Sequence, residues 1–449
     1  MPGPDRPDGW NRRDLLAWTG AAVAGAVAAP WARAATPAAA ARLTGWHPEG
    51  LNGTFTLSNA TVVTHEGRRM AGAGVRVEDG QVVALGPSVT GGVDLGGRWI
   101  VPGFTDAGCQ VGLVEVSMEG SSADRGEDSD AVVPDARAWD GYHPLSDVIG
   151  VTRAHGITSV LVQPAANRLV PGQVGLLQTA GRTRDEALLH SPAGLLICLG
   201  KAGTGGGGPS SRMGVAMRLR ELFAEVDLPD AEAEASGRKR RRKGDAADEG
   251  GDGDHTPAER VWRAALTGEL PVLFHAERAD DVLFACELAR EWKLRAALMG
   301  AAEAWIVADE VAAAEMPVLL GPLTVQPDRF EHAHARYDNA AMLHARGVPL
   351  AFRTGAAHFS RGLSTSAGVA VAHGLPWEAA ITALTAGVGD ALGIEGHGHL
   401  AEGAAATFFV SEGDPLQPRH AVQRVWIGGQ EASMDHRQRR LFQQYRELW

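Results

Sequence analysis

The middle of the chain alternates short apolar runs with segments of helical periodicity, and this alternation limits the fold more than any other feature. Helical patterns over 278–292 and 303–314, for example, separate apolar runs that have the length of strands. Such an order is typical of a parallel sheet whose faces are covered by helices. The expected strands are 103–111, 158–163, 194–199, 270–275, 296–299, 317–321 and 348–353. We therefore expect an α/β fold that approaches the (β/α)8 TIM-type barrel, in which sites form at the carboxyl ends of the strands.

Shorter strands with turns between them flank this region on both sides. On the N-terminal side they are expected at 55–63, 74–80, 81–86 and 93–100. Asp79-Gly80 is a strong hairpin signal, because a type I′ turn requires positive φ at both central residues. Two segments near the other end, 403–415 and 422–430, have the same pattern. The sequence thus predicts β structure at both ends of the barrel region.

The first residues have the pattern of an export signal. Arg12-Arg13 precedes an alanine-rich apolar run to Pro30, and Ala32-Arg33-Ala34 offers a cleavage site. Residues 1–34 therefore resemble a twin-arginine signal peptide, with 35–50 as a linker, and they predict export of a folded protein to the periplasm. The apolar run is too short and too rich in alanine to span about 30 Å of hydrocarbon, so no stable membrane anchor is expected after cleavage.

Composition narrows the classes of partner. The 54 acidic residues exceed the 42 basic ones, for a net charge of −12, and this argues against a nucleic-acid partner. The three cysteines lack C-x-x-C spacing, so they are expected to be buried free thiols. Residues 229–257 are rich in Ala, Gly, Asp and Glu around a basic run at 238–243, and cannot bury a core. We expect a disordered surface insertion there, either a solvated linker or an interaction or protease-sensitive tag.

Residues 101–112 resemble the first barrel strand of the amidohydrolase superfamily, in which Pro-Gly-Phe-x-Asp-Ala precedes His-x-His. The resemblance runs over 51–449. Within the superfamily, the chain is similar to bacterial amidohydrolases allied to imidazolonepropionase and cyclic amidases. It is also carried by 112–116, 155–162, 171–181, 271–281 and 413–415. It implies a barrel over 103–386, a composite β-sandwich built from 51–102 and 387–449, and hydrolysis of carbon–nitrogen bonds other than peptide bonds.

Members of this superfamily hold one or two divalent metals, which lower the pKa of a bound water to near 7. Their ligands are two histidines of strand one, one histidine each from strands five and six, and an aspartate of strand eight. Carried onto this chain, strand one has Gly108 and Gln110, strand six has Gly300, and the aspartate position, which is also that of the catalytic acid and base, is Gly355. Only His275, on strand five, is retained.

Neighbouring residues do not restore this site in the sequence. Cys109 lies between the two lost positions, and the alternation of side chains along a strand points it outward. A lysine that relatives often have after the Gly-Gln segment is Gln178 here. Because catalytic zinc needs about three protein ligands, the pattern favours a site without a metal, and no cofactor is expected.

Three hypotheses follow from this pattern. In the first, the chain is a metal-free pseudoenzyme that acts as a binding or partner subunit, with an active amidohydrolase paralogue or with copies of itself. In the second, it is an active hydrolase of a cyclic amide or amidine with a rebuilt zinc site around His275 and His358, with His332, His334 and Glu277 as further ligands. In the third, it binds a small molecule in the old pocket. The residues expected to line that pocket are Gln110, Asn167, Gln173, His275, Glu277 and Arg353.

A second His-x-His, His397-Gly-His399, lies in a glycine-rich turn near the C-terminal end, and we expect no functional role for it.

Overall fold

A computed structural model of the chain describes residues 50–226, 228, 255–323 and 329–446. The chain divides into units 1–50 and 51–449, and the fold described below is that of the second. The predicted export signal and its linker lie outside the described residues except for Gly50, and so does 229–254 of the predicted insertion. No helix in the described part is both long and apolar enough to cross a membrane.

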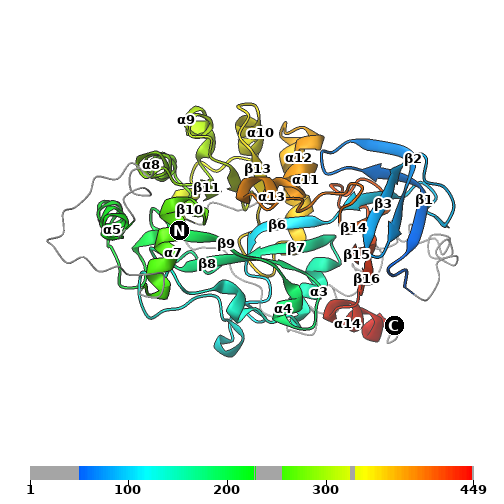
Figure 1. Ribbon diagram of the computed structural model, residues 1–449, viewed down its shortest axis with the longest axis horizontal. Helices are drawn as coiled ribbons and strands as arrows, with labels where there is room; N and C mark the ends of the chain where they lie inside the picture. Colours follow the sequence, from blue (N-terminus) through cyan, green and yellow to red (C-terminus); the bar gives the residue numbers. More distant parts are fainter. Residues whose placement is uncertain (1–49, 227, 229–254, 324–328, 447–449) are drawn as a thin grey trace, which may run out of the picture. The chain divides into compact units, whose positions relative to one another are not determined.

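Eight strands form a nearly closed sheet in the middle of the molecule (Figure 1). They follow one another in chain order around the sheet, and the last lies beside the first. The strands are β6 (Phe104–Cys109), β7 (Ile157–Val162), β8 (Gly172–Gln178), β9 (Leu188–Cys198), β10 (Val272–Ala276), β11 (Ala296–Gly300), β12 (Val318–Leu320) and β13 (Leu350–Phe352). The predicted α/β barrel is confirmed.

One strand, β8, differs from the expected parallel pattern. It pairs antiparallel with both β7 and β9, whereas the other neighbours in this sheet are parallel. Residues 163–171, which join β7 to β8, are too few for the crossover that a parallel neighbour requires. The chain therefore turns back on itself, and the sequence pattern did not predict this strand.

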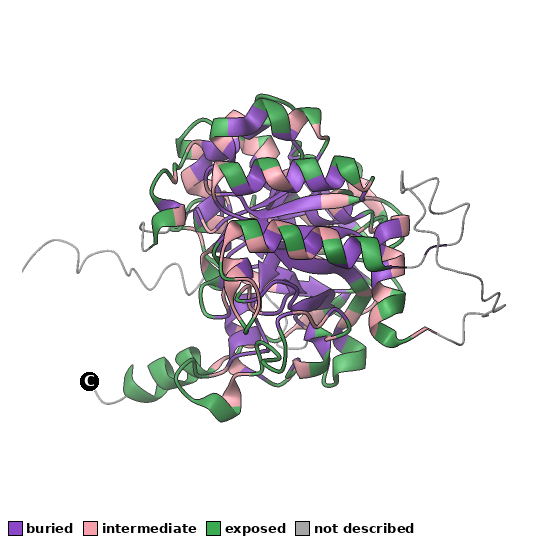
Figure 2. Ribbon diagram, turned by 90° about the vertical axis from the view of Figure 1, so that its left-hand side faces the viewer, coloured by how far each residue is buried: buried purple, intermediate pink, exposed green. Residues whose placement is uncertain are grey.

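Helices cover the outside of the barrel, and Figure 2 shows their buried faces turned toward the strands. The α-helices are α3 (Asp147–Arg153), α4 (Arg184–Ala187), α5 (Arg212–Glu225), α7 (Pro257–Thr267), α8 (Ala279–Glu291), α9 (Ala308–Ala313), α10 (Asn339–His344), α11 (Leu363–Ala372), α12 (Trp377–Leu384), α13 (Gly387–Leu392) and α14 (Arg437–Arg446). Short 3-10 helices are η2 (Gly120–Ser122), η3 (Ala138–Gly141), η4 (Ala202–Thr204), η5 (Ala304–Val307), η6 (Phe330–His332) and η7 (Ser360–Gly362). The helices predicted at 278–292 and 303–314 are α8 and the pair η5 and α9.

Helix α7 begins within the predicted insertion, whose C-terminal boundary was therefore placed too late. Pro257, which was assigned to the insertion, is the first residue of α7. Thr256 caps this helix through the N–H of Glu259, and the Glu259 side chain returns to the Thr256 N–H, which is a capping box. Residues 256 and 257 therefore belong to the start of a capped helix, not to an insertion without structure.

The two ends of the described chain share a second eight-stranded sheet. Its strands are β1 (Phe55–Val63), β2 (Arg69–Glu78), β3 (Gln81–Gly86), β4 (Val93–Asp94), β5 (Trp99–Pro102), β14 (Phe408–Ser411), β15 (Val422–Ile427) and β16 (Gln430–Ala432). Antiparallel pairing of β5 with β14 joins the ends, as the family resemblance implied. The rings of Phe55 on β1 and Trp426 on β15 are 5.6 Å apart although β5 and β14 separate their strands, so the sheet curls.

Aromatic packing connects this sheet to the barrel. The rings of Phe104 on β6 and Phe409 on β14 meet edge to face at 4.9 Å. Both belong to one buried apolar cluster that also includes residues of the covering helices. A separate cluster, which includes Leu161, Leu273 and Met299, fills the interior of the barrel.

Candidate functional site

Gly108, which stands at the first lost ligand position, lies near the end of β6 and faces occupied space. A Cβ atom on Gly108 would lie 2.6 Å from Gln163 Oε1, 2.9 Å from Arg353 Nε and 3.3 Å from Met299 Cε. The space into which a histidine would project is therefore filled by other side chains. Cys109 is buried among the residues that face the helices, as strand alternation predicted.

The other two glycines at ligand positions also face polar side chains. A Cβ on Gly300, at the end of β11, would lie 2.6 Å from Glu277 Oε1. A Cβ on Gly355, just beyond β13, would lie 3.3 Å from Arg353 Nη2, and the Gly355 N–H donates to Gly108 O at 2.8 Å. A guanidinium and a carboxylate thus stand where the resemblance implies ligands to a metal.

Arg353 directly follows β13 and is only 4% exposed. Its Nη1 donates to Gly321 O at 3.1 Å and its Nη2 to Gln163 Oε1 at 3.2 Å, while its buried Nε has no partner in the described part of the chain. Burial lowers the pKa of Arg353, and the charges of Glu277 and Asp106 act in the opposite direction. The interior of the barrel therefore contains a positive charge of its own.

Glu277 directly follows β10 and supplies negative charge near this arginine. Its Oε2 accepts the Ala302 N–H at 3.1 Å, and its Oε1 lies 3.4 Å from His275 Nε2 and 3.9 Å from His332 Nε2. Burial raises the pKa of Glu277, but His332, His275 and Arg353 together lower it by more. The carboxyl group is therefore ionised at neutral pH.

His275 is buried and neutral. Burial lowers its pKa to about 4, although the charge of Glu277 raises it. Its Nδ1 has no hydrogen-bond partner among the described residues. His275, Glu277 and His332 lie together, yet no group of three or more His, Cys, Asp or Glu side chains within the described ranges is arranged to hold a metal. The free space beside Glu277 and Gly300 amounts to about 10 Å³.

The remaining histidines of the rebuilt-site hypothesis lie elsewhere. The side chain of His334 is 65% exposed, and its Nδ1 lies 2.8 Å from Glu303 Oε1. His358 is exposed on the segment after β13. The structure does not bring either of them to His275.

The polar residues predicted to line the old pocket mostly hold loops in place. Gln173 Nε2 donates to Pro134 O at 3.0 Å, and Asn167 Oδ1 accepts from Arg168 Nε at 3.3 Å. Gln110 is partly exposed just after β6. Gln178 pairs with Ser159 at the start of β7, so the antiparallel course of β8 places it at the opposite end of the barrel from Gly108.

Two residues of the site, Asp106 and Gln163, were missed in the sequence. Asp106 on β6 is fully buried and accepts hydrogen bonds from Thr354 N at 3.0 Å and from Ser360 Oγ at 2.8 Å. Burial raises its pKa to about 6 despite these bonds. An aspartate inside an otherwise apolar strand was the available signal for Asp106, whereas nothing near Gln163 pointed to Arg353.

The second His-x-His has a structural role. His397 Nε2 lies 2.9 Å from Thr105 Oγ1 on β6. The ring of His399 stacks on that of His65, with centroids 4.1 Å apart and planes 9° from parallel. The turn is therefore part of the packing between β6 and the segments after β1 and α13, and no metal arrangement occurs there in the described chain.

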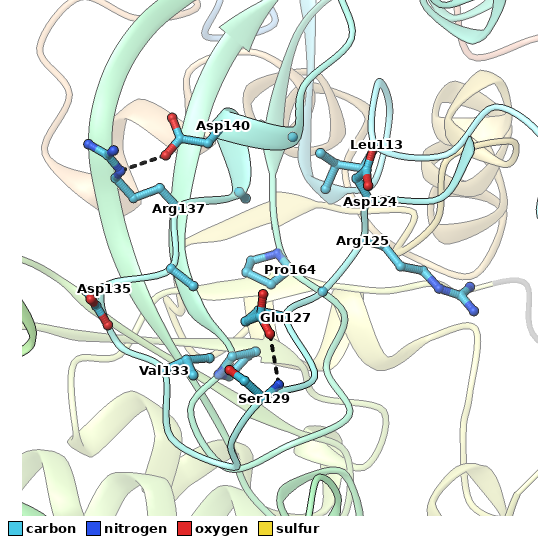
Figure 3. Close-up of a pocket in the computed structure, with 15 residues that line it drawn as sticks. Leu113, Asp124, Arg125, Glu127, Ser129, Val133, Asp135, Arg137, Asp140 and Pro164 are labelled. Atoms are coloured by element: carbon cyan, nitrogen blue, oxygen red, sulfur yellow. Dashed lines mark hydrogen bonds and ion pairs between the residues drawn. The ribbon is translucent and has the colours of Figure 1, made fainter. Parts of the chain in front are cut away.

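A larger cavity of about 580 Å³ lies among the loops that follow β6 and β7 (Figure 3). Its lining includes charged side chains of both signs and several apolar ones, and the Arg137–Asp140 ion pair stands on one side of it. Arg353 and His275 do not line it. This cavity is thus displaced from the centre of the barrel.

Comparisons with known proteins agree with this fold. No family model matches the chain. It is 24% identical over 367 residues to amidohydrolase tasK of Hapsidospora irregularis, a match that covers 75% of this chain but only 36% of that protein. An amidohydrolase from Thermotoga maritima MSB8 has 27% identity and a TM-score of 0.74, over 85% of this chain and 100% of that one. A prolidase complexed with N-methylphosphonate-L-proline, at 15% identity, a TM-score of 0.53, and coverage of 85% and 99%, is similar in fold.

Proposed function

We propose that this chain, an amidohydrolase-superfamily protein by fold and by sequence relationship, functions without a bound metal, as a binding or partner subunit of an exported complex. The observation that carries the proposal is the filling of the ligand positions. Gly108 and Gly355 adjoin the guanidinium of Arg353, and Gly300 adjoins the carboxylate of Glu277.

The charges of the site argue against a metal at the family position. A divalent cation there would lie close to the buried positive charge of Arg353, and charges repel strongly where water is excluded. Of the four family ligand types, only the strand-five histidine, His275, is present, whereas zinc needs about three protein ligands. With glycine at position 355, the site also lacks the carboxylate that would move a proton during attack on a carbon–nitrogen bond.

The test is elemental analysis of the mature protein, purified without chelator and again after incubation with zinc and with manganese. We expect well under one metal ion per chain in all three samples, and no hydrolysis of a panel of cyclic amides and amidines. The His275→Ala variant should have the same metal content as the natural protein. One bound metal per chain that disappears in His275→Ala, together with hydrolysis, would show that the proposal is wrong.

A second candidate, an active hydrolase with a rebuilt site, is favoured by one observation. His275 Nε2 and His332 Nε2 lie 3.4 and 3.9 Å from the same oxygen of Glu277. Donors on one zinc ion lie about 2.0–2.2 Å from it, so these atoms are near enough for small side-chain movements to bring them to a common point. The same elemental analysis on His332→Ala decides it, because loss of a bound metal in that variant would support the rebuilt site.

A further inference from the structure

The C-terminal helix α14 lies on the molecule without being packed into it. None of its residues is buried, and Figure 2 shows it exposed on all sides. Leu441, Phe442 and Tyr445, which share one side of the helix, are 36%, 65% and 55% exposed. A ten-residue helix is too short to be stable in water by itself, and most helices owe their stability to a packed apolar face. The exposed face of α14 is therefore suited to a partner.

The contacts of α14 with its own chain are polar and exposed. Arg440 donates to Asp147 on α3 at 3.0 Å and to Asp435 at 2.8 Å, and Arg439 donates to Met434 O at 3.0 Å. Exposed ion pairs of this kind contribute at most about 1 kcal/mol each. They orient the helix. Arg437 and Arg446, at its two ends, have no ion pair in the described chain, although the Arg446 guanidinium lies 6.0 Å from the centre of the Phe442 ring.

The cavity of about 580 Å³ offers a surface of opposite charge, which we call the loop groove. In the described chain the carboxylates of Asp124 and Asp135 have no ion pair, and Glu127 accepts hydrogen bonds from Ser129, whose N–H lies 2.9 Å away. The lining also includes one arginine that has no ion pair in the described chain, Arg125, so these three carboxylates outnumber the cationic groups available to pair with them. The apolar part of the lining consists of Leu113, Val133, Pro164 and Pro171.

The loop that forms this groove is held firmly in place. Arg168 is 1% exposed, and its Nη1 donates to Asp130 O at 2.8 Å while its Nη2 pairs with Asp128. Gln173 on β8 binds the same loop through Pro134 O. The groove is therefore formed before any partner arrives, which reduces the entropy cost of binding.

We propose that α14 of one copy of this chain docks against the loop groove of a second copy, and that the exchange is reciprocal around a two-fold axis. The helix contributes four arginines, and the groove has an excess of carboxylates. Phe442 and Tyr445 contact the apolar lining, because the cavity accommodates large side chains but not a whole helix. A chain with a net charge of −12 repels its copies elsewhere, so the basic helix also determines where they meet.

The experiment measures the mass of the mature protein in solution by light scattering after gel filtration, at micromolar concentration and low salt. We expect twice the chain mass, and half that value in the Phe442→Ser/Tyr445→Ser variant. The dimer should also dissociate at high salt, because exposed charges are then screened. A natural protein that is monomeric under these conditions would overturn the proposal.

Charge reversal tests the specific pairing. Arg437→Glu/Arg446→Glu and Asp124→Arg/Asp135→Arg should each give monomers, and a mixture of the two variants should restore the dimer mass. Arg290→Glu, at an exposed arginine of α8 that belongs to neither surface, is the matched control and should remain dimeric. Dimers in both reversed variants would refute the pairing. So would a monomer whose α14 binds vesicles of anionic phospholipid, which would identify a membrane surface as the occupant. The metal content of the protein does not depend on its mass in solution. A monomer would therefore contradict the docking of α14 without contradicting the proposed function.

Discussion

At the scale of single residues, the lost ligands and the buried charges are two parts of one change. Glycine at positions 108, 300 and 355 removes the side chains that would hold a metal and leaves space that Arg353 and Glu277 fill. Arg353 is buried, and its charge is balanced by Glu277 and Asp106. A site of this kind keeps its charge balance without an ion, and each of its members then depends on the others.

Replacement of Arg353 by methionine tests this dependence. We expect the free energy of unfolding to fall by about 3–5 kcal/mol, because the Glu277 carboxylate loses a buried partner. In the double variant Arg353→Met/Glu277→Gln the loss should be smaller than the sum of the two single losses. Urea unfolding measures the free energy of unfolding of the two single variants and of the double variant. Arg290→Met, at an exposed arginine of α8, is the control and should change stability by less than about 0.5 kcal/mol. Equal effects of Arg353→Met and the control would contradict the assigned role.

The close approach of Glu277 to Gly300 gives a second prediction. Gly300→Ala introduces a Cβ 2.6 Å from Glu277 Oε1 at a residue whose φ is +93°, so both contact and backbone strain oppose it. Gly207, with a φ of +75° and nothing within 4 Å of its Cβ position, supplies a control for backbone strain alone. We expect Gly300→Ala to lower stability by about 1–3 kcal/mol more than Gly207→Ala in urea unfolding. Similar losses in both variants would show that Glu277 does not occupy this space.

At the scale of elements, the partly buried His397 joins the turn after α13 to β6 and should make stability depend on pH. Burial, followed by the nearby His399, lowers the pKa of His397 to about 4 from 6.5. At pH values between about 4 and 6.5, His397 is protonated in the unfolded chain but neutral in the folded chain. Stability therefore falls as the pH is lowered from about 6.5 to about 4, by at most about 1.4 kcal/mol per unit.

Substitution of His397 by glutamine removes this titration and leaves a group that can still bond Thr105. The difference in stability between the natural protein and His397→Gln should therefore change by up to about 3 kcal/mol between pH 7 and pH 4. Urea unfolding at several pH values gives that difference, and groups that titrate in both proteins cancel. His344→Gln, at an exposed histidine, is the control. A difference that stays constant with pH would exclude His397 as the source.

The elements differ in how far the sequence could predict them. Strands β1 and β3 were predicted with the ends that the structure has, because their polarity alternates and Asp79-Gly80 fixes the hairpin between β2 and β3. Strand β8 was missed, since its direction follows from a short connection rather than from its own residues. The three glycines were identified, but the partners that fill their space were not. Arg353 and Gln163 are 190 residues apart in the chain, and only the closed barrel brings them together.

At the scale of the whole molecule, the two ends of the described chain depend on each other. The β5 strand of the N-terminal side pairs with β1 on one edge and with β14 of the C-terminal side on the other. Phe409 of β14 in turn packs on Phe104 of the barrel. A chain without its last strands would leave β5 with unpaired backbone groups and would uncover Phe104. Exposed edges and apolar surface of this kind promote aggregation.

Two truncations separate this dependence from the role of α14. A chain that ends at Glu402 should lose its cooperative unfolding transition and its near-ultraviolet circular dichroism, because β14 to β16 are removed from a sheet that needs them. A chain that ends at Met434 lacks only α14 and its flanking residues. None of the removed residues that the structure describes, 435–446, is buried, so this chain should keep both signals and most of its stability. Since the strands of the curled sheet and the barrel share one apolar cluster, the chain that ends at Met434 should show a single transition in calorimetry. Two separate transitions there, or a folded chain that ends at Glu402, would mean that the barrel is stable without the sheet built from both ends.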